Sequence, residues 1–126
     1  MKPTLALLWL AILIGVLAHS VLGFVPMLYG GEPLKQSKNL QGLLWQLTLV
    51  FSAYLTLALA VLLSETTWLK WLNLIASGFF IFSNTLHAGV HLFLSPIEWH
   101  QVVLLTLVAV INVAHFKLSL TYLNSL

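Results

Sequence analysis

Four long apolar segments, separated by short polar connections, constrain the fold of this chain more than any other feature of its sequence. A membrane-spanning α-helix needs about 20 predominantly apolar residues to cross a hydrocarbon core about 30 Å thick. Each segment is long enough to do so, and we therefore predict four transmembrane helices. They lie at about residues 5–28, 43–63, 68–94 and 97–122.

The composition supports this prediction. Of the 126 residues, 60% are hydrophobic and 6% are charged, whereas soluble domains carry about 25% charged residues. A chain of this length has room for one domain, so we predict a single membrane domain over residues 1–126. Three connections between four helices leave both termini on the same side. The predicted fold class is all-α, an integral membrane, four-transmembrane-helix, up-and-down bundle.

The first apolar run exceeds the hydrophobic region of about 7–15 residues in a signal peptide and lacks an A-x-A cleavage site, so we interpret it as a transmembrane helix. Small residues recur along it at every fourth position, with a histidine among them. These residues are Ala11, Gly15, His19 and Gly23. Such a stripe favours close packing against a neighbouring helix.

Lysine positions predict the orientation, because positively charged residues are enriched in cytoplasmic loops. Lys2, Lys70 and Lys117 fall near the side that holds the termini, and Lys35 and Lys38 fall on the other side. We expect an integral protein of the bacterial inner (plasma) membrane, in contact with the lipid bilayer, with both termini in the cytoplasm.

The start of the fourth helix carries a local signal. The run Ser95-Pro96-Ile97-Glu98 has the pattern of a capping box with proline at the first helical position. This pattern predicts a helix whose N-cap is Ser95.

Cysteine and arginine are both missing from the chain, and their absence excludes several functions. Without cysteine there is no disulfide framework, no thiolate metal site and no covalent c-type haem attachment. Without arginine, and with a net charge of only +2, the chain has no basic patch for nucleic acid. Any metal ion must be held by histidine, carboxylate, asparagine or methionine.

The third apolar segment contains three polar residues on one face. Asn84, His87 and His91 are spaced i, i+3, i+7, which places them on the same side of a helix. Polar residues inside a membrane normally face a bundle interior or a water-filled cavity, and they are candidates for a functional site.

Depth in the bilayer can be compared by counting residues at about 1.5 Å each from the helix midpoints. His19 and His87 lie about four and five residues beyond the midpoints of the first and third segments, toward the same surface, so we expect them at one level. His91 lies one turn further out. His100, at the start of the fourth helix, enters from that surface. His115 lies in the opposite half, and we expect it near the other interface.

Two kinds of site are compatible with these histidines. His19 and His87, on different helices at one depth, suit the two axial ligands of haem b. Alternatively, His87 and His91 bind one transition metal ion together, with His19, His100 or Glu98 completing the ligand set. A purely structural interpretation also stands, in which each histidine hydrogen-bonds to a neighbouring helix.

Two asparagines lie near the midplane of their helices. Asn84 is in the third segment and Asn112 is in the fourth. We interpret them as supporting polar residues that hydrogen-bond between helices and fix the register.

We therefore expect a small polytopic membrane protein with a histidine-lined site that binds haem b or a transition metal ion, for electron transfer or metal handling. One alternative is a non-catalytic accessory or assembly subunit of a larger membrane complex, or of a homo-oligomer. A small transporter or proton pathway ranks below these. An enzyme is the least favoured class, because the three acidic residues, Glu32, Glu65 and Glu98, lie in or beside loops and the chain has no thiol nucleophile.

Overall fold

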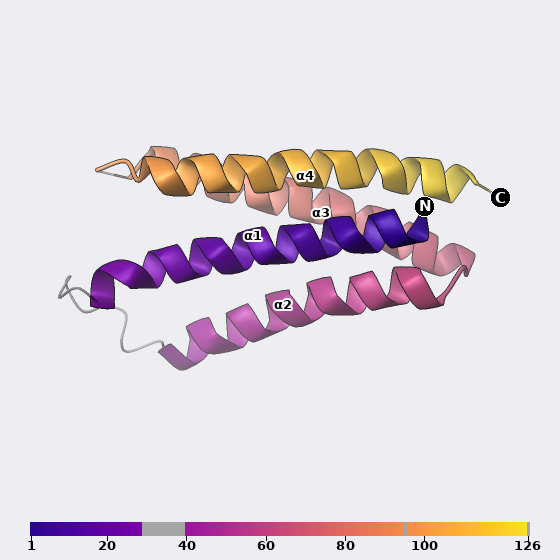
Figure 1. The fold of residues 1–126 in the computed structure, drawn as a ribbon, viewed down its shortest axis with the longest axis horizontal. Helices are drawn as coiled ribbons and strands as arrows, with labels where there is room; N and C mark the ends of the chain where they lie inside the picture. Colours follow the sequence, from indigo (N-terminus) through magenta and orange to yellow (C-terminus); the bar gives the residue numbers. More distant parts are fainter. Residues whose placement is uncertain (29–39, 95, 126) are drawn as a thin grey trace.

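A computed structural model of the chain describes residues 1–28, 40–94 and 96–125, with the side chains of 1–23, 41–94 and 96–125. The described residues form four α-helices, as the apolar segments predict. The helices are α1 (Lys2–Leu28), α2 (Leu40–Leu63), α3 (Thr67–Leu92) and α4 (Trp99–Asn124) (Figure 1). The prediction of an all-α chain with four helices is confirmed.

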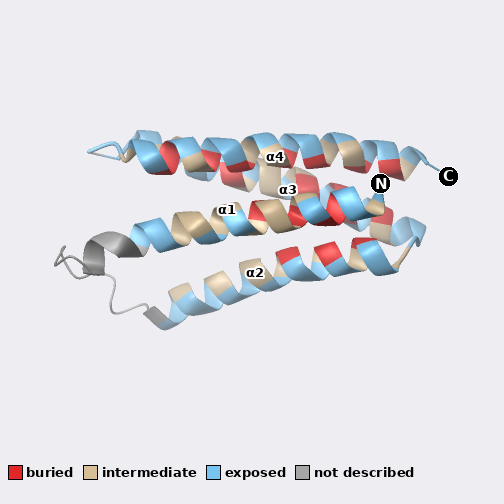
Figure 2. Cartoon of the chain, viewed as in Figure 1, coloured by how far each residue is buried: buried red, intermediate tan, exposed pale blue. Residues whose placement is uncertain are grey.

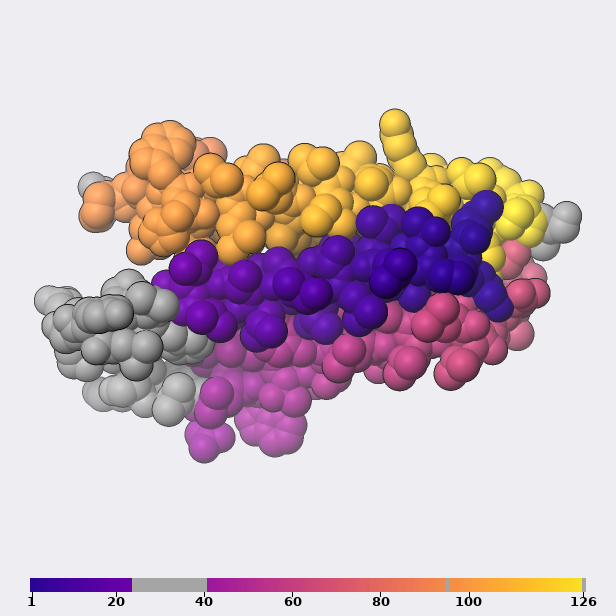
Figure 3. Space-filling model, viewed as in Figure 1, coloured from indigo at the N-terminus to yellow at the C-terminus, as the bar shows by residue number. Residues whose placement is uncertain are grey.

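The helices alternate in direction, and the two termini lie at the same end of the molecule (Figure 1). At that end Nζ of Lys2 is 2.8 Å from Oε1 of Glu65, so the start of α1 is tied to the turn between α2 and α3. The Lys2 ammonium holds the pKa of the Glu65 carboxyl below its usual range. The helix α1 packs against both α2 and α4, and α3 packs against α4, whereas α2 and α3 touch only sparsely. Figure 3 shows α1 lying across one face of the molecule.

The predicted capping box is wrong in its position. The helix α4 begins at Trp99 with Glu98 as N-cap, and no side chain caps it. Glu98 has non-helical dihedrals, φ −88° and ψ 81°, so Pro96 and Ile97 lie outside the helix. Its carboxylate lies 3.7 Å from His91. Ser95, the predicted cap, is outside the described residues.

Three helical stretches are long and apolar enough to cross a membrane. They are Lys2–Gly23, Gln41–Leu63 and Trp99–Asn124. The helix α3, predicted as a fourth span, does not meet this criterion of composition. It is long enough, with 26 residues, but it carries polar side chains such as Lys70, Asn73 and Asn84.

Many polar side chains lie inside the bundle, and many large apolar side chains lie on its outer surface. The buried polar residues are Lys70, Asn73, Ser77, Asn84, Gln101, Asn112, His115 and Ser119. The exposed face of α3 is formed by Trp68, Trp71, Ile75, Phe79, Phe82, Leu86 and Val90. Figure 2 shows the buried stripe on the inner side of each helix. The low mean hydropathy of α3 therefore reflects its inner face.

Hydrogen bonds join the inner faces of α3 and α4 in the half of the bundle that holds the termini. Nδ2 of Asn73 donates to Oγ of Ser119 over 2.8 Å, and Oδ1 of Asn73 accepts from Nε1 of Trp9 over 2.7 Å. Nδ1 of His115 and Oγ of Ser77 are 2.9 Å apart. These partners satisfy groups that would otherwise be costly to bury.

The apolar core lies in the same half of the bundle. Its buried members are Leu5, Ala6, Trp9 and Ile12 of α1, Tyr54, Ala58 and Val61 of α2, and Val108 and Tyr122 of α4. All the buried residues of α2 belong to its second half, whereas 41–50 are half-buried or exposed. The first half of α2 therefore stands away from the core (Figure 2).

The helices α1 and α4 approach closely at Gly15. A Cβ added to Gly15 would overlap Cγ2 of Val108. This contact agrees with the stripe of small residues predicted along the first helix. Valine is branched at Cβ and has few rotamers with which to yield.

We predict that Gly15→Ala lowers the thermal stability. Alanine normally favours a helix interior over glycine by about 1 kcal/mol, but crowding in a packed core costs roughly 1–3 kcal/mol. Gly89→Ala is the matched control, because nothing lies within 4 Å of its added Cβ. Thermal unfolding in detergent, followed by circular dichroism, should give a lower Tm for Gly15→Ala alone. Equal Tm values for the two variants would contradict the close contact.

Candidate functional site

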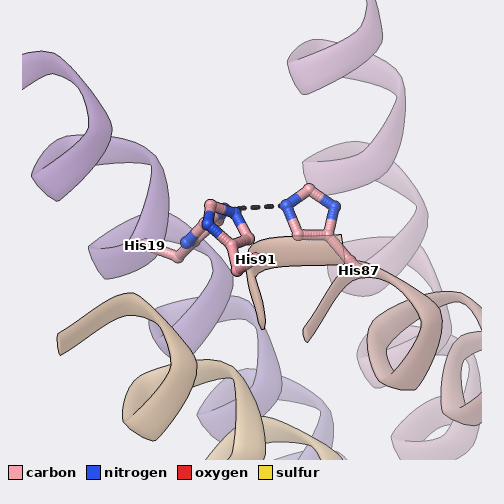
Figure 4. A group of neighbouring side chains, drawn as sticks. All are labelled: His19, His87 and His91. Carbon is pink, nitrogen blue, oxygen red and sulfur yellow. Dashed lines mark hydrogen bonds between the residues drawn. The ribbon is translucent and has the colours of Figure 1, made fainter. Parts of the chain in front are cut away.

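Three histidines converge in the half of the bundle away from the termini. His19 comes from α1, and His87 and His91 come from α3, where their spacing of four residues stacks them on one face. One ring nitrogen from each lies within 4.8 Å of the others. Figure 4 shows the three rings gathered at one point between the helices. We call these residues the histidine triad.

The depth count is confirmed for the first pair. Nε2 of His19 and Nε2 of His87 are 3.0 Å apart. The ring centroids of the triad are separated by 4.9 Å for His19 and His87, and by 5.1 Å for each pair that includes His91. Three imidazoles at these distances could hold a single metal ion.

Gln101 of α4 makes two hydrogen bonds to His19, one to its ring and one to its backbone. Nδ1 of His19 lies 2.6 Å from Oε1 of Gln101, and Nε2 of Gln101 donates to the carbonyl oxygen of His19 over 3.3 Å. An amide oxygen can only accept, so Nδ1 of His19 carries the proton and Nε2 keeps a free lone pair. The 3.0 Å contact then requires His87 to donate from its own Nε2.

Sequence reasoning did not identify Gln101. The available signal was its position on the face of α4 that also carries Leu105, Val108 and Asn112, all of which are buried. A glutamine on the inner face of an apolar helix needs a partner for its amide. Here that partner is a ligand candidate, which makes Gln101 a positioning residue.

Glu98 is an acidic side chain beside the triad. Its Oε2 lies 3.7 Å from Nδ1 of His91, too far for a hydrogen bond, and that buried nitrogen has no hydrogen-bond partner among the described residues. We therefore treat the pair as an electrostatic contact. A carboxylate at this distance offsets positive charge held by the triad.

The two remaining histidines lie outside the triad. His100, predicted as a further metal ligand, is exposed and does not belong to the metal-competent group. The inner face of α4 starts at Gln101, one residue later, and each residue turns the helix by about 100°. His115, expected near the opposite interface, is fully buried. Its ring centroid is 4.0 Å from that of Trp9.

The two asparagines predicted as interhelical partners do form a hydrogen bond. Nδ2 of Asn84 donates to Oδ1 of Asn112 over 2.6 Å, and it also lies 3.4 Å from the hydroxyl of Tyr54. Both asparagines are buried. They separate the triad from the polar groups of the other half.

A cleft of about 560 Å³ adjoins the triad and is lined by side chains of all four helices and by Glu98. Most of its wall is apolar, and its polar groups gather near the histidines. The lining residues used below are Leu43, Leu47, Val50, Phe79, Phe80 and Ser83. Small-molecule sites have this combination of size, apolar wall and few polar groups.

Comparison with protein-family models, with curated proteins and with solved structures found no match to this chain.

We predict that Gln101→Leu loosens the tautomer of His19. A hydrogen bond of this kind contributes about 0.5–1.5 kcal/mol net, so its loss should shift the tautomer ratio by roughly 2- to 12-fold. The measurement is ¹⁵N NMR of histidine-labelled protein without added metal. Gln46→Leu is the matched control, because Gln46 lines the same cleft but the bonds described for His19 go to Gln101 and His87. An unchanged His19 spectrum in Gln101→Leu would refute the assignment.

Proposed function

We propose that all four helices span a lipid bilayer, including α3. The support is the distribution of side chains on α3, whose large apolar side chains face outward and four of whose polar side chains are buried in the bundle. The buried ones are Lys70, Asn73, Ser77 and Asn84. Lipid meets the outward face, and the inner polar groups have hydrogen-bond partners on other helices. A helix of this kind satisfies the bilayer although its mean hydropathy is low.

Exposed tryptophans at both ends of the bundle support the same proposal. Trp68 and Trp71 lie at the end that holds the termini, and Trp45 and Trp99 lie near the starts of α2 and α4 at the other end. Tryptophan is enriched at both interfaces of a membrane, where its ring meets the headgroups. Their separation along the bundle suits two such interfaces.

Single cysteines test the four spans, because the chain has no cysteine of its own. Thr66→Cys lies in the turn between α2 and α3, and Pro96→Cys lies between α3 and α4; both positions are exposed. We expect a membrane-impermeant maleimide to label Thr66→Cys from one side of sealed vesicles and Pro96→Cys from the other. Labelling of both from the same side would show that α3 does not cross.

We further propose that the protein binds one transition metal ion through the histidine triad. The observation that carries this proposal is the convergence of three ring nitrogens within 4.8 Å. In a tetrahedral site with bonds of about 2.0–2.1 Å, ligand nitrogens lie about 3.3 Å apart. Small side-chain movements bring the triad to that geometry. Neutral imidazoles suit Zn²⁺, Cu²⁺, Ni²⁺ and Fe²⁺.

The second contact of His19 suits a ligand role. Metal-bound histidines usually donate their other ring N–H to an oxygen acceptor, which fixes the tautomer and raises the basicity of the ligating nitrogen. Gln101 accepts from Nδ1 of His19 over 2.6 Å and so leaves Nε2 for the ion.

The geometry favours a single ion over haem b. Two axial imidazoles of a haem lie on opposite sides of the ring, about 4 Å apart through the iron. In this bundle Nε2 of His19 and Nε2 of His87 are 3.0 Å apart. The centroid of the His91 ring lies 5.1 Å from the centroid of each of the other two rings. A macrocycle would have to displace the third ring.

The role we propose is metal handling within the membrane. Three protein ligands leave a fourth coordination position open, as sites that bind exchangeable ligands do. Protons compete with the ion for imidazole nitrogens, so binding weakens as the pH falls.

Metal titration of the purified protein tests the proposal. We expect one Co²⁺ or Zn²⁺ per chain, and a loss of affinity of at least about 10-fold in each of His19→Ala, His87→Ala and His91→Ala, because each removes a ligand. His100→Ala is the matched control and should bind like the parent. Metal content is measured by elemental analysis after dialysis, and affinity by the visible spectrum of Co²⁺.

Three results would contradict the metal site. They are the absence of stoichiometric metal, an equal loss of affinity in His100→Ala, and a Soret band in the purified protein that disappears in His19→Ala. The last would identify haem b as the ligand of the same histidines.

A further inference from the structure

The cleft beside the triad has one wall from the first half of α2 and another from α3. Leu43, Leu47 and Val50 lie on the first wall together with Gln46, and Phe79 and Phe80 lie on the second. Because α2 and α3 touch only sparsely, the space between them is not filled by their own side chains. A molecule that fits these walls must be largely apolar.

The polar end of the cleft is different in character. The triad, Gln101 and Glu98 all line it. A fourth ligand of the proposed ion would lie beside Gln101 and Glu98. A molecule that fits both ends has an apolar body and a single polar head.

Charge specifies the head group. A divalent ion held by three neutral imidazoles carries two positive charges into a surrounding of low polarity. Glu98 is the one acidic residue among those described that line the cleft, so one positive charge is left over. An uncompensated charge in such a place is costly, and an anionic fourth ligand removes it.

We infer that the cleft binds a long-chain carboxylate, whose head group is the fourth ligand of the metal ion and whose chain lies between α2 and α3. This inference rests on the proposed metal site. A small anion such as acetate would leave the apolar walls unfilled. A long-chain alcohol would fill them but would bring no charge.

The experiment uses the full chain in phosphatidylcholine nanodiscs, loaded with Co²⁺, whose visible absorption reports its ligands. Palmitate, hexadecanol and acetate are the three probes. We expect palmitate to change the Co²⁺ spectrum at a concentration at least 10-fold lower than acetate does. Hexadecanol should leave the spectrum unchanged.

A pair of variants separates the cleft from the metal site. Ser83 lines the cleft, and Ser83→Phe should fill part of it. Thr85, two residues further along α3, is exposed, and Thr85→Phe is the matched control. We expect Ser83→Phe to weaken the palmitate response at least 10-fold with Co²⁺ affinity retained, and Thr85→Phe to leave both unchanged. Retained Co²⁺ binding also reports that each variant is folded.

The outcomes distinguish this inference from the function on which it rests. If Co²⁺ binds and palmitate leaves its spectrum unchanged, or acts no better than acetate or hexadecanol, the carboxylate site is wrong and the metal site stands. An equal effect of the two phenylalanine variants also overturns it. If Co²⁺ does not bind, both proposals fail.

Discussion

The pairing of polar side chains between α3 and α4 is the constraint on which the rest of the structure depends. The partners are Asn73 with Ser119, Ser77 with His115, and Asn84 with Asn112. From pair to pair the residue number rises along α3 and falls along α4, as it does between antiparallel helices. A single register of the two helices therefore satisfies all three pairs. A shift of α4 by one turn would leave buried polar groups on both helices without partners, which costs roughly 1–3 kcal/mol for each group. The same register brings Gln101 into contact with His19.

This pairing also explains how a polar helix coexists with an apolar exterior. The buried polar groups of α3 have hydrogen-bond partners inside the bundle, so the outer face of this helix can be hydrophobic. The arrangement is the reverse of a helix on the surface of a soluble protein, whose polar side faces water. A mean hydropathy taken over the whole helix cannot distinguish the two cases, because it averages over faces that meet different surroundings.

The sequence allows depth along a helix to be predicted much better than direction around it. An error of one residue moves a side chain by about 1.5 Å along the axis but by about 100° around it. The level of His19 and His87 was therefore predictable from approximate midpoints. The direction of His100 was not, because α4 begins at Trp99 and not at the predicted proline. The expectation for His115 came from its depth alone, which does not predict that its ring lies buried against Trp9.

Contacts between helices were still harder to predict. The bond from Gln101 to His19 joins residues that are 82 positions apart, and no local pattern specifies it. The cleft depends on how far α2 stands from α3, and no spacing within either helix encodes that distance. The stripe of small residues around Gly15 did predict close packing, because small residues at a regular spacing can be recognised from the sequence alone.

The packing of α2 has a mechanical consequence. Its buried residues begin at Tyr54, and within the described part of the chain its side-chain hydrogen bond to another helix is made by that same tyrosine. The preceding turns of α2 therefore have no fully buried side chain and, among the described residues, no side-chain hydrogen bond to another helix. The width of the cleft between α2 and α3 thus depends on the most weakly attached part of the bundle.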